Sequence, residues 1–218
     1  MFFASYGSFM HSLLEQFYKG EITREEMKIK YLFDFRKNVL GERPKESVVS
    51  NYIKQGAAYI DNFEPFSYMP VAVEQKVDFE IGGNRFTGFI DYVGLDEPSG
   101  ELCVIDHKSR DLKPRGKGKK RTQKDARLDE YLRQLYLYAA AVKNIHGSFP
   151  GFLIFNCFRT NTVIKEPFSQ SDFNAALQWA ENKAEEIKDA DDLHPNIDFF
   201  SCKYICGVNH ECCFYEKR

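Results

Sequence analysis

The spacing of apolar residues predicts a helical N-terminal part of the chain. Apolar side chains recur at helical intervals over residues 5–19. The sequence T-R-E-E at residues 23–26 is a capping box, which predicts the start of a second helix. A third helix is expected from about residue 47 to residue 63, ahead of Pro65.

The pattern changes to period two after Pro65. Apolar and charged side chains alternate over residues 71–81, which predicts a strand with one solvated face. A Gly-Gly-Asn turn leads into a second strand over residues 85–95, and the apolar run 102–105 is typical of a strand at a sheet centre. The rest of the chain predicts a helix, two strands and a last helix over residues 128–145, 151–158, 162–168 and 169–189. These elements predict a three-layer α/β domain with a central mixed sheet flanked by helices.

Composition narrows the class of protein. With 43% hydrophobic and 15% aromatic residues, the 218-residue chain is too apolar to be generally disordered and fits one domain with a small appendage. No apolar run approaches the roughly 20 residues of a membrane span. The N-terminal residues lack the basic region and cleavage site of a signal peptide. We therefore expect a cytoplasmic protein that makes no contact with membranes.

The formal net charge of −2 hides a strongly basic segment. Residues 108–127 hold ten Lys or Arg and two Asp, a charge of +8, so the rest of the chain carries −10. The segment has no periodicity and no aromatic residue, so we expect a loop that contacts nucleic-acid phosphates without reading sequence. The alternative is a disordered run of charges that faces solvent. Both interpretations hold if the loop is mobile in the free protein and becomes ordered on DNA. The candidate DNA contacts are Arg110, Lys113, Arg115, Lys117, Lys119, Lys120 and Arg121.

Acidic residues and a lysine gather at the ends of two predicted strands. Asp106 and Lys108 are two residues apart, so they point to one face of the third strand, and the hairpin brings Asp91 alongside. Carboxylates bind hard divalent cations such as Mg²⁺ or Mn²⁺, which polarise a phosphoryl oxygen and generate hydroxide. The lysine would stabilise charge in the transition state. A hairpin with solvated charges is the alternative, although Asp106 ends an apolar strand.

Four motifs in order resemble the PD-(D/E)xK nuclease superfamily, and specifically its RecB-like branch, which includes the CRISPR-adaptation nucleases. The motifs are G-x-x-x-H at residues 7–11, G-x-x-D at 88–91, D-x-K at 106–108 and Q-x-x-x-Y at 134–138. The resemblance runs from about Gly7 to the C-terminus. It implies a restriction-endonuclease-like core and a nuclease dependent on Mg²⁺ or Mn²⁺.

The resemblance also implies roles for single residues. The implied metal ligands are His11, Asp91, Asp106 and the backbone carbonyl of His107. Lys108 would assist the attacking water, while Gln134 and Tyr138 would contact DNA or orient the lysine. Structural roles in packing are the alternatives for His11, Gln134 and Tyr138. Glu74 lies where some relatives have another acid, but its place on the polar face predicts a solvated charge.

We therefore expect a deoxyribonuclease, most simply an exonuclease in recombination, repair or phage DNA processing. The alternative is a non-catalytic DNA-binding module, which would have no need of the complete His, Asp, Asp and Lys set. The predicted nuclease domain covers residues 1–198, with a helical part at 1–66 and a sheet core at 67–190. A small Cys-rich tail follows at residues 199–218.

The tail places Cys202, Cys206 and Cys212 in a C-x3-C-x5-C pattern. In many RecB-like nucleases such a trio joins an N-terminal cysteine to hold a [4Fe-4S] cluster. Here no cysteine precedes Cys103 and six residues precede Gly7, so we expect an absent or incomplete cluster unless a preceding segment supplies the fourth ligand.

Two other interpretations of the tail remain. His210 or Cys213 could complete a local site, and three Cys with one His suit Zn²⁺. The thiols could instead be reduced and unligated. Cys103 and Cys157 lie in apolar strands, so we expect both to be packing residues.

Overall fold

A computed structural model of the chain describes residues 2–41, 43–116, 118, 120–190, 195 and 197–215. The chain forms two compact units, a helical one from residues up to 62 and from 190 onward, and a sheet unit from residues 63–189. The predicted domain boundaries at 66, 190 and 198 remain predictions. Among the described helices, none combines the length and the apolar character that crossing a membrane requires.

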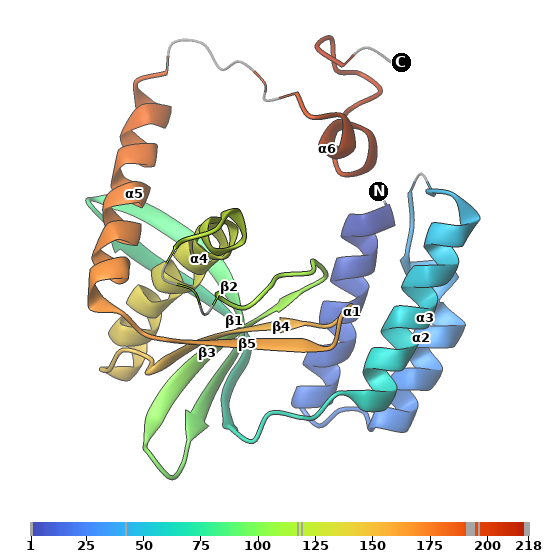
Figure 1. Ribbon diagram of the computed structural model, residues 1–218, viewed down its shortest axis with the longest axis horizontal. Coiled ribbons are helices and arrows are strands. Elements are labelled where there is room, and N and C mark those ends of the chain that lie inside the picture. The colour runs from blue at the N-terminus through green and yellow to red at the C-terminus, as the bar shows by residue number, and fades with distance from the viewer. Residues whose placement is uncertain are drawn as a thin grey trace. The chain divides into compact units, whose positions relative to one another are not determined.

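The helical unit contains α1 (Phe2–Tyr18), α2 (Arg24–Asn38), α3 (Glu46–Asn62) and the short α6 (Phe199–Tyr204). Helix α2 contacts both α1 and α3 (Figure 1). The predicted capping box is confirmed, because Thr23 and Glu26 cap each other's backbone N–H at the start of α2. Helix α6 was not predicted. It begins where the Asp198 carboxylate accepts a hydrogen bond from the Ser201 backbone N at 2.7 Å.

Aromatic side chains hold the two ends of the chain together inside this unit. The Phe3 ring on α1 lies 5.2 Å from the Phe200 ring and 5.7 Å from the Tyr204 ring, centroid to centroid. These distances are typical of stabilising aromatic pairs. The tail is therefore docked on the first turns of α1 by apolar contacts.

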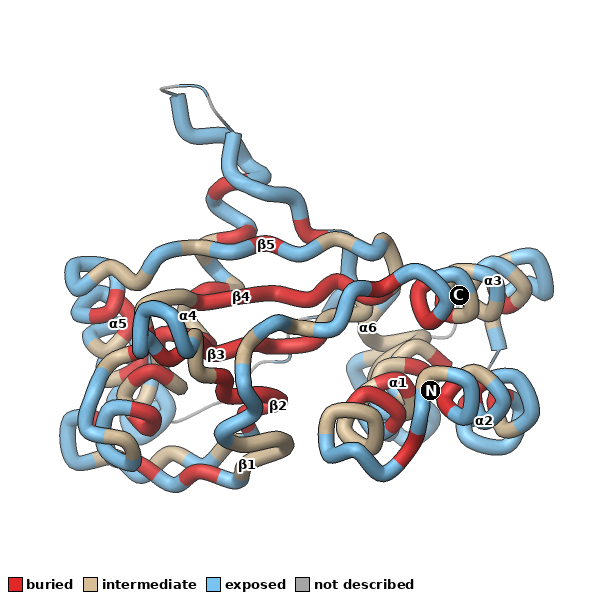
Figure 2. Tube along the Cα trace, turned by 90° about the horizontal axis from the view of Figure 1, so that it is seen from below, coloured by how far each residue is buried: buried red, intermediate tan, exposed pale blue. Residues whose placement is uncertain are grey.

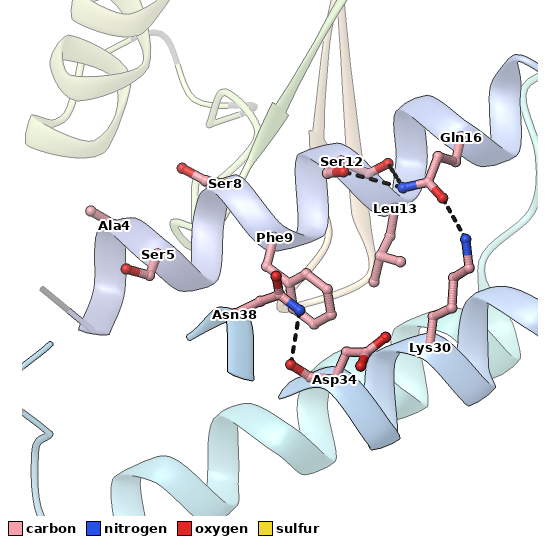
Figure 3. A pocket seen from close by; sticks show the side chains of 10 residues that line it. All are labelled: Ala4, Ser5, Ser8, Phe9, Ser12, Leu13, Gln16, Lys30, Asp34 and Asn38. Atoms are coloured by element: carbon pink, nitrogen blue, oxygen red, sulfur yellow. Dashed lines mark hydrogen bonds between the residues drawn. The ribbon is translucent and has the colours of Figure 1, made fainter. Parts of the chain in front are cut away.

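A groove lies between α1 and α2, and Figure 3 shows Gln16 of α1 and Lys30 of α2 joined across it. Lys30 of α2 donates a hydrogen bond to Gln16 Oε1 of α1 at 2.7 Å. Because this bond is exposed to solvent, it adds little stability. Buried aromatic residues, including Tyr6 and Tyr31, form the core instead.

The sheet unit is built on five strands in the order β1-β2-β3-β4-β5. Strands β3 and β4 are parallel and the other pairs are antiparallel, so the sheet is mixed as predicted. The strands are β1 (Met69–Ile81), β2 (Asn84–Asp96), β3 (Glu101–Lys108), β4 (Phe152–Cys157) and β5 (Thr162–Pro167). Helix α4 (Gln123–His146) connects the parallel pair, since parallel strands need a crossover.

The centre of the sheet is buried on both faces. Figure 2 shows β3 and β4 as almost continuous buried runs, as expected from their unbroken apolar sequence. Helix α4 contacts β1, β3 and β4, while α5 (Gln170–Lys188) contacts α4 and β1. Cys103 and Cys157 are completely buried, which confirms that they are packing residues.

The basic loop begins directly after Lys108, as expected, but it ends earlier than predicted. Lys108 is the last residue of β3, and α4 begins at Gln123, so residues 123–127 are helical. The reason is a second capping box, in which Thr122 accepts from the Asp125 backbone and Asp125 accepts from the Thr122 backbone. The loop is thus limited to residues 109–122.

Candidate active site

Strands β2 and β3 separate at the position of the predicted site. The β2–β3 ladder ends at the pair Tyr92 and Ile105, whereas the β3–β4 ladder continues to Lys108 and Cys157. The ladder with β2 thus stops two residues before His107. The His107 backbone N–H donates a hydrogen bond to Asp91 Oδ2 at 2.6 Å. This bond fixes the Asp91 carboxylate against the strand that carries Asp106.

Two carboxylates are buried at this point of the sheet. Asp91 is 8% exposed and Asp106 is 4% exposed. Burial of charged groups is costly unless they are paired. Lys108 Nζ lies 2.7 Å from Asp106 Oδ2, which supplies one opposite charge. The oxygen-rich donor set fits a hard divalent cation such as Mg²⁺ or Mn²⁺.

A chain of polar contacts leads from Lys108 to helix α4. Lys108 Nζ donates to Gln134 Oε1 at 2.9 Å, and Gln134 Nε2 donates to the Tyr138 hydroxyl at 3.0 Å. Gln134 and Tyr138 lie four residues apart and so share one helix face. Burial raises the pKa of Tyr138, and the nearby charges of Asp106 and Asp91 raise it further. The phenol therefore stays neutral at physiological pH.

Glu74 lies beside the site, although the sequence favoured a solvated charge at this position. It is half-buried rather than solvated, and it lies opposite Asp91, between the ladder pairs Val73–Tyr92 and Gln75–Ile90. A carboxylate oxygen of Glu74 lies within 4.8 Å of one of Asp91. Its backbone has φ 51°, a left-handed conformation that is uncommon for a residue other than glycine. No local sequence signal marks this conformation.

The other predicted ligands lie in the helical unit. His11 is half-buried on α1, and its part in metal binding remains a prediction. Cys202, Cys206, Cys212 and Cys213 are free thiols, and His210 is exposed. Within residues 197–215, which the structure describes, these side chains do not form a group with the spacing of metal ligands. The cluster or zinc site at the tail stays a prediction.

The predicted DNA contacts fall into three groups. Arg110 and Lys120 are exposed, while Lys117 and Lys119 lie outside the described residues. Lys113 pairs with Asp111, two residues before it, at 2.8 Å. Arg115 and Arg121 pair with acidic residues of the sheet unit. Part of the positive charge expected for DNA is thus neutralised within the protein.

Comparison with known proteins identifies the family and the fold of the chain. The family model of the PD-(D/E)XK nuclease superfamily matches residues 3–213. A crystal structure from Eubacterium rectale, described as a "Putative exonuclease", superposes with a TM-score of 0.51 at 16% identity, over 92% of this chain and 80% of the other. No curated protein matches the chain. The α/β fold is restriction-endonuclease-like, as expected, and the chain belongs to the PD-(D/E)XK nuclease superfamily.

Proposed function

We propose that the protein is a deoxyribonuclease dependent on Mg²⁺ or Mn²⁺. The observation that carries the proposal is the contact chain from Asp106 through Lys108 and Gln134 to Tyr138, beside the Asp91 carboxylate. A structural ion pair would not need a second carboxylate held against the same strand by a backbone N–H. A metal-dependent hydrolase needs both the carboxylates and a cation beside them.

Each residue has a separate role in this proposal. Asp91, Asp106 and the His107 carbonyl would hold the metal ion, together with His11 of the helical unit. When bound, the metal supplies Lewis-acid polarisation of the phosphoryl oxygen and a hydroxide nucleophile. Lys108 places a positive charge where negative charge develops in the transition state. Gln134 limits the positions open to the Lys108 ammonium group.

We also propose the finer assignments that the motifs favour. The four RecB-like motifs support DNA as substrate, exonucleolytic action, and a task in recombination, repair or phage DNA processing. The description of the Eubacterium rectale structure is compatible with an exonuclease.

The decisive experiment measures cleavage of end-labelled single-stranded and duplex DNA with Mg²⁺, with Mn²⁺ and with EDTA. Asp106→Asn and Lys108→Met should each lower the rate by roughly 10²-fold or more, because both act on the transition state. Asp96→Asn, at the far end of β2, is the control and should cut like the wild type. Equal cutting by all four proteins would refute the assigned site.

Two further measurements separate the alternatives. Closed circular DNA should resist the enzyme if it is an exonuclease and should be cut if it is an endonuclease. A wild-type protein that binds DNA but cuts none under any metal condition would be the non-catalytic binding module instead.

A further inference from the structure

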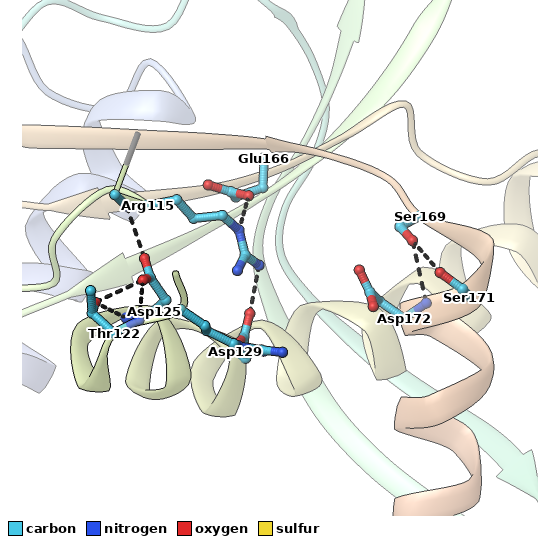
Figure 4. Close-up of polar contacts among 10 residues, drawn as sticks. Arg115, Thr122, Asp125, Asp129, Glu166, Ser169, Ser171 and Asp172 are labelled. Carbon is cyan, nitrogen blue, oxygen red and sulfur yellow. Dashed lines mark hydrogen bonds and ion pairs between the residues drawn. The ribbon is translucent and has the colours of Figure 1, made fainter. Parts of the chain in front are cut away.

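Arg115 links the basic loop to two elements of the sheet unit. Its Nε lies 2.7 Å from Glu166 Oε2 on β5, and its Nη2 lies 2.6 Å from Asp129 Oδ1 on α4. Figure 4 shows the guanidinium group between these two carboxylates. The Glu166 and Asp129 side chains are 16% and 24% exposed. Pairs this shielded hold their geometry better than pairs in open solvent, and an arginine fork suits two acceptors.

The second half of the same loop is also attached to α4. Asp125 accepts hydrogen bonds from the backbone N–H of Gly116 at 2.9 Å and of Thr122 at 2.7 Å. Arg121 pairs with Asp129, which therefore binds two arginines of the loop. The bond from Gly116, followed by those from Thr122, lowers the pKa of Asp125 to about 2. This carboxylate thus remains charged at every physiological pH.

Both ends of residues 116–121 therefore meet on the first turns of α4. By sequence, the residues between these ends include Lys117, Lys119 and Lys120. The loop leaves β3 directly after Lys108, the lysine of the D-x-K motif. Its attachment to α4 and β5 limits where the exposed Lys120 can go.

We propose that Arg115 is a positioning residue, which clamps the basic loop to Asp129 and Glu166 so that the loop meets a nucleic-acid backbone with Gly116 and Thr122 already fixed. The proposal rests on the proposed nuclease function. It removes Arg115 and Arg121 from the predicted set of direct phosphate contacts and makes them part of the scaffold of the loop.

The clamp would favour DNA binding by lowering the entropic cost of ordering the loop, an effect that charge attraction alone does not include. Ordering a free loop on a ligand costs conformational entropy, whereas a loop fixed beforehand loses less on binding. Acidic residues beside a basic patch otherwise only weaken the attraction of nucleic acid. Neutralising one of the clamp acids should therefore weaken DNA binding if the clamp matters, and strengthen DNA binding if only net charge matters.

Two variants and one control test these opposite expectations. Asp129→Asn adds one positive charge, yet it should weaken DNA binding by about three- to tenfold because it releases both arginines. Arg115→Lys keeps the charge, yet it should weaken binding similarly, because an ammonium group is a point charge that lacks the guanidinium fork. Glu130→Gln adds the same charge at the next residue of α4 and should leave binding unchanged or slightly tighter.

Binding is measured by fluorescence anisotropy of a labelled single-stranded oligonucleotide at two salt concentrations, with Ca²⁺ in place of Mg²⁺. Steady-state cleavage should show a raised KM for DNA with kcat retained in both clamp variants, as a positioning role requires. Tighter binding by both Asp129→Asn and Glu130→Gln would overturn the clamp in favour of charge alone.

Limited trypsin digestion tests the clamp without reference to DNA. Cleavage within residues 115–121 should be faster in Asp129→Asn and Arg115→Lys than in the wild type or in Glu130→Gln. Equal cleavage in all four would overturn the clamp even if DNA binding were strong. A wild type that neither binds nor cuts DNA would refute the proposed function, and with it the role of the clamp in DNA binding. The digestion pattern would still show whether Arg115 and Asp129 hold the loop in place.

Discussion

Gly88 of β2 leaves room for the aromatic ring of Tyr138 on α4. A β-carbon at position 88 would lie 2.8 Å from Tyr138 Cε1, closer than carbon atoms normally approach. The glycine of the G-x-x-D motif and the tyrosine of the Q-x-x-x-Y motif are therefore parts of one packing contact. Through Gln134, that contact extends to Lys108.

Gly88→Ala should reduce DNA cleavage while leaving the protein folded. The added methyl group displaces Tyr138, and overpacking of this kind costs roughly 1–3 kcal/mol. The measurement combines urea unfolding with the initial rate of cleavage. In a Tyr138→Ala background the same glycine substitution should cost almost no stability, because the clash is gone. An equal cost in both backgrounds would show that the two residues do not interact.

Gln134→Leu should lower kcat with little change in the affinity for DNA. Leucine approximates the shape of glutamine but accepts no hydrogen bond, so the Lys108 ammonium group loses its contact with α4. We expect a fall of about tenfold, typical of a residue that orients an active-site group. Arg133→Leu, at the preceding position of the helix, provides the control. Similar losses in both variants would indicate a general disturbance of α4.

The raised pKa of Tyr138 predicts the shape of the pH–rate profile. Because burial and two carboxylates hold its pKa above the usual 10.0, the phenol keeps its proton throughout the alkaline range used in assays. Tyr138→Phe should therefore leave the alkaline limb of the profile unchanged, whatever it does to the absolute rate. A shift of that limb would assign the titration to Tyr138.

Acid should remove the contribution of Asp125 to stability. Its pKa of about 2 in the folded state lies below the unfolded value of about 3.9, so its stabilisation is complete above that value and is lost as the pH falls toward 2. Asp125→Asn should therefore lower the melting temperature at pH 6 and lower it progressively less below pH 4. A constant difference from pH 6 to pH 3 would contradict the pKa. Glu130→Gln serves as the control for net charge.

Metal removal should leave the tail in place, because Phe3, Phe200 and Tyr204 hold it through ring contacts. Hydrogen exchange of residues 199–204 should be unchanged by a chelator and faster in Phe3→Ala. Protection that disappears with the chelator would instead favour a metal or [4Fe-4S] site at Cys202, Cys206 and Cys212. The absorption spectrum and metal content of anaerobically purified protein would then identify it.

The sequence predicted those features that depend on local patterns. The alternation over residues 71–81, the apolar run at 102–105 and the capping box at Thr23 each correspond to an element of the structure. The pairing of Asp106 with Lys108 was accessible for the same reason, because residues two apart on a strand share a face.

Features that depend on contacts distant in sequence could not be predicted. Nothing near Glu74 indicates its left-handed backbone, which depends on the strands beside it. The partners of Arg115 lie 14 and 51 residues away in the sequence. A count of charges within the basic segment therefore could not reveal that these two acids neutralise the charge of Arg115. The start of α4 was missed for another reason. Its capping box, T-Q-K-D at residues 122–125, is a local pattern that could have been recognised within the basic segment.

The hydrogen bond from the His107 backbone N–H to Asp91 gives the site a built-in reporter. This amide proton is hydrogen-bonded to the Asp91 carboxylate, which would bind the metal ion. The amide group itself would not be a metal ligand. Its NMR chemical shift should follow the charge carried by Asp91. Binding of a divalent cation could thus be followed through the His107 amide signal of ¹⁵N-labelled protein. The measurement uses the wild-type protein and needs no substitution at the site.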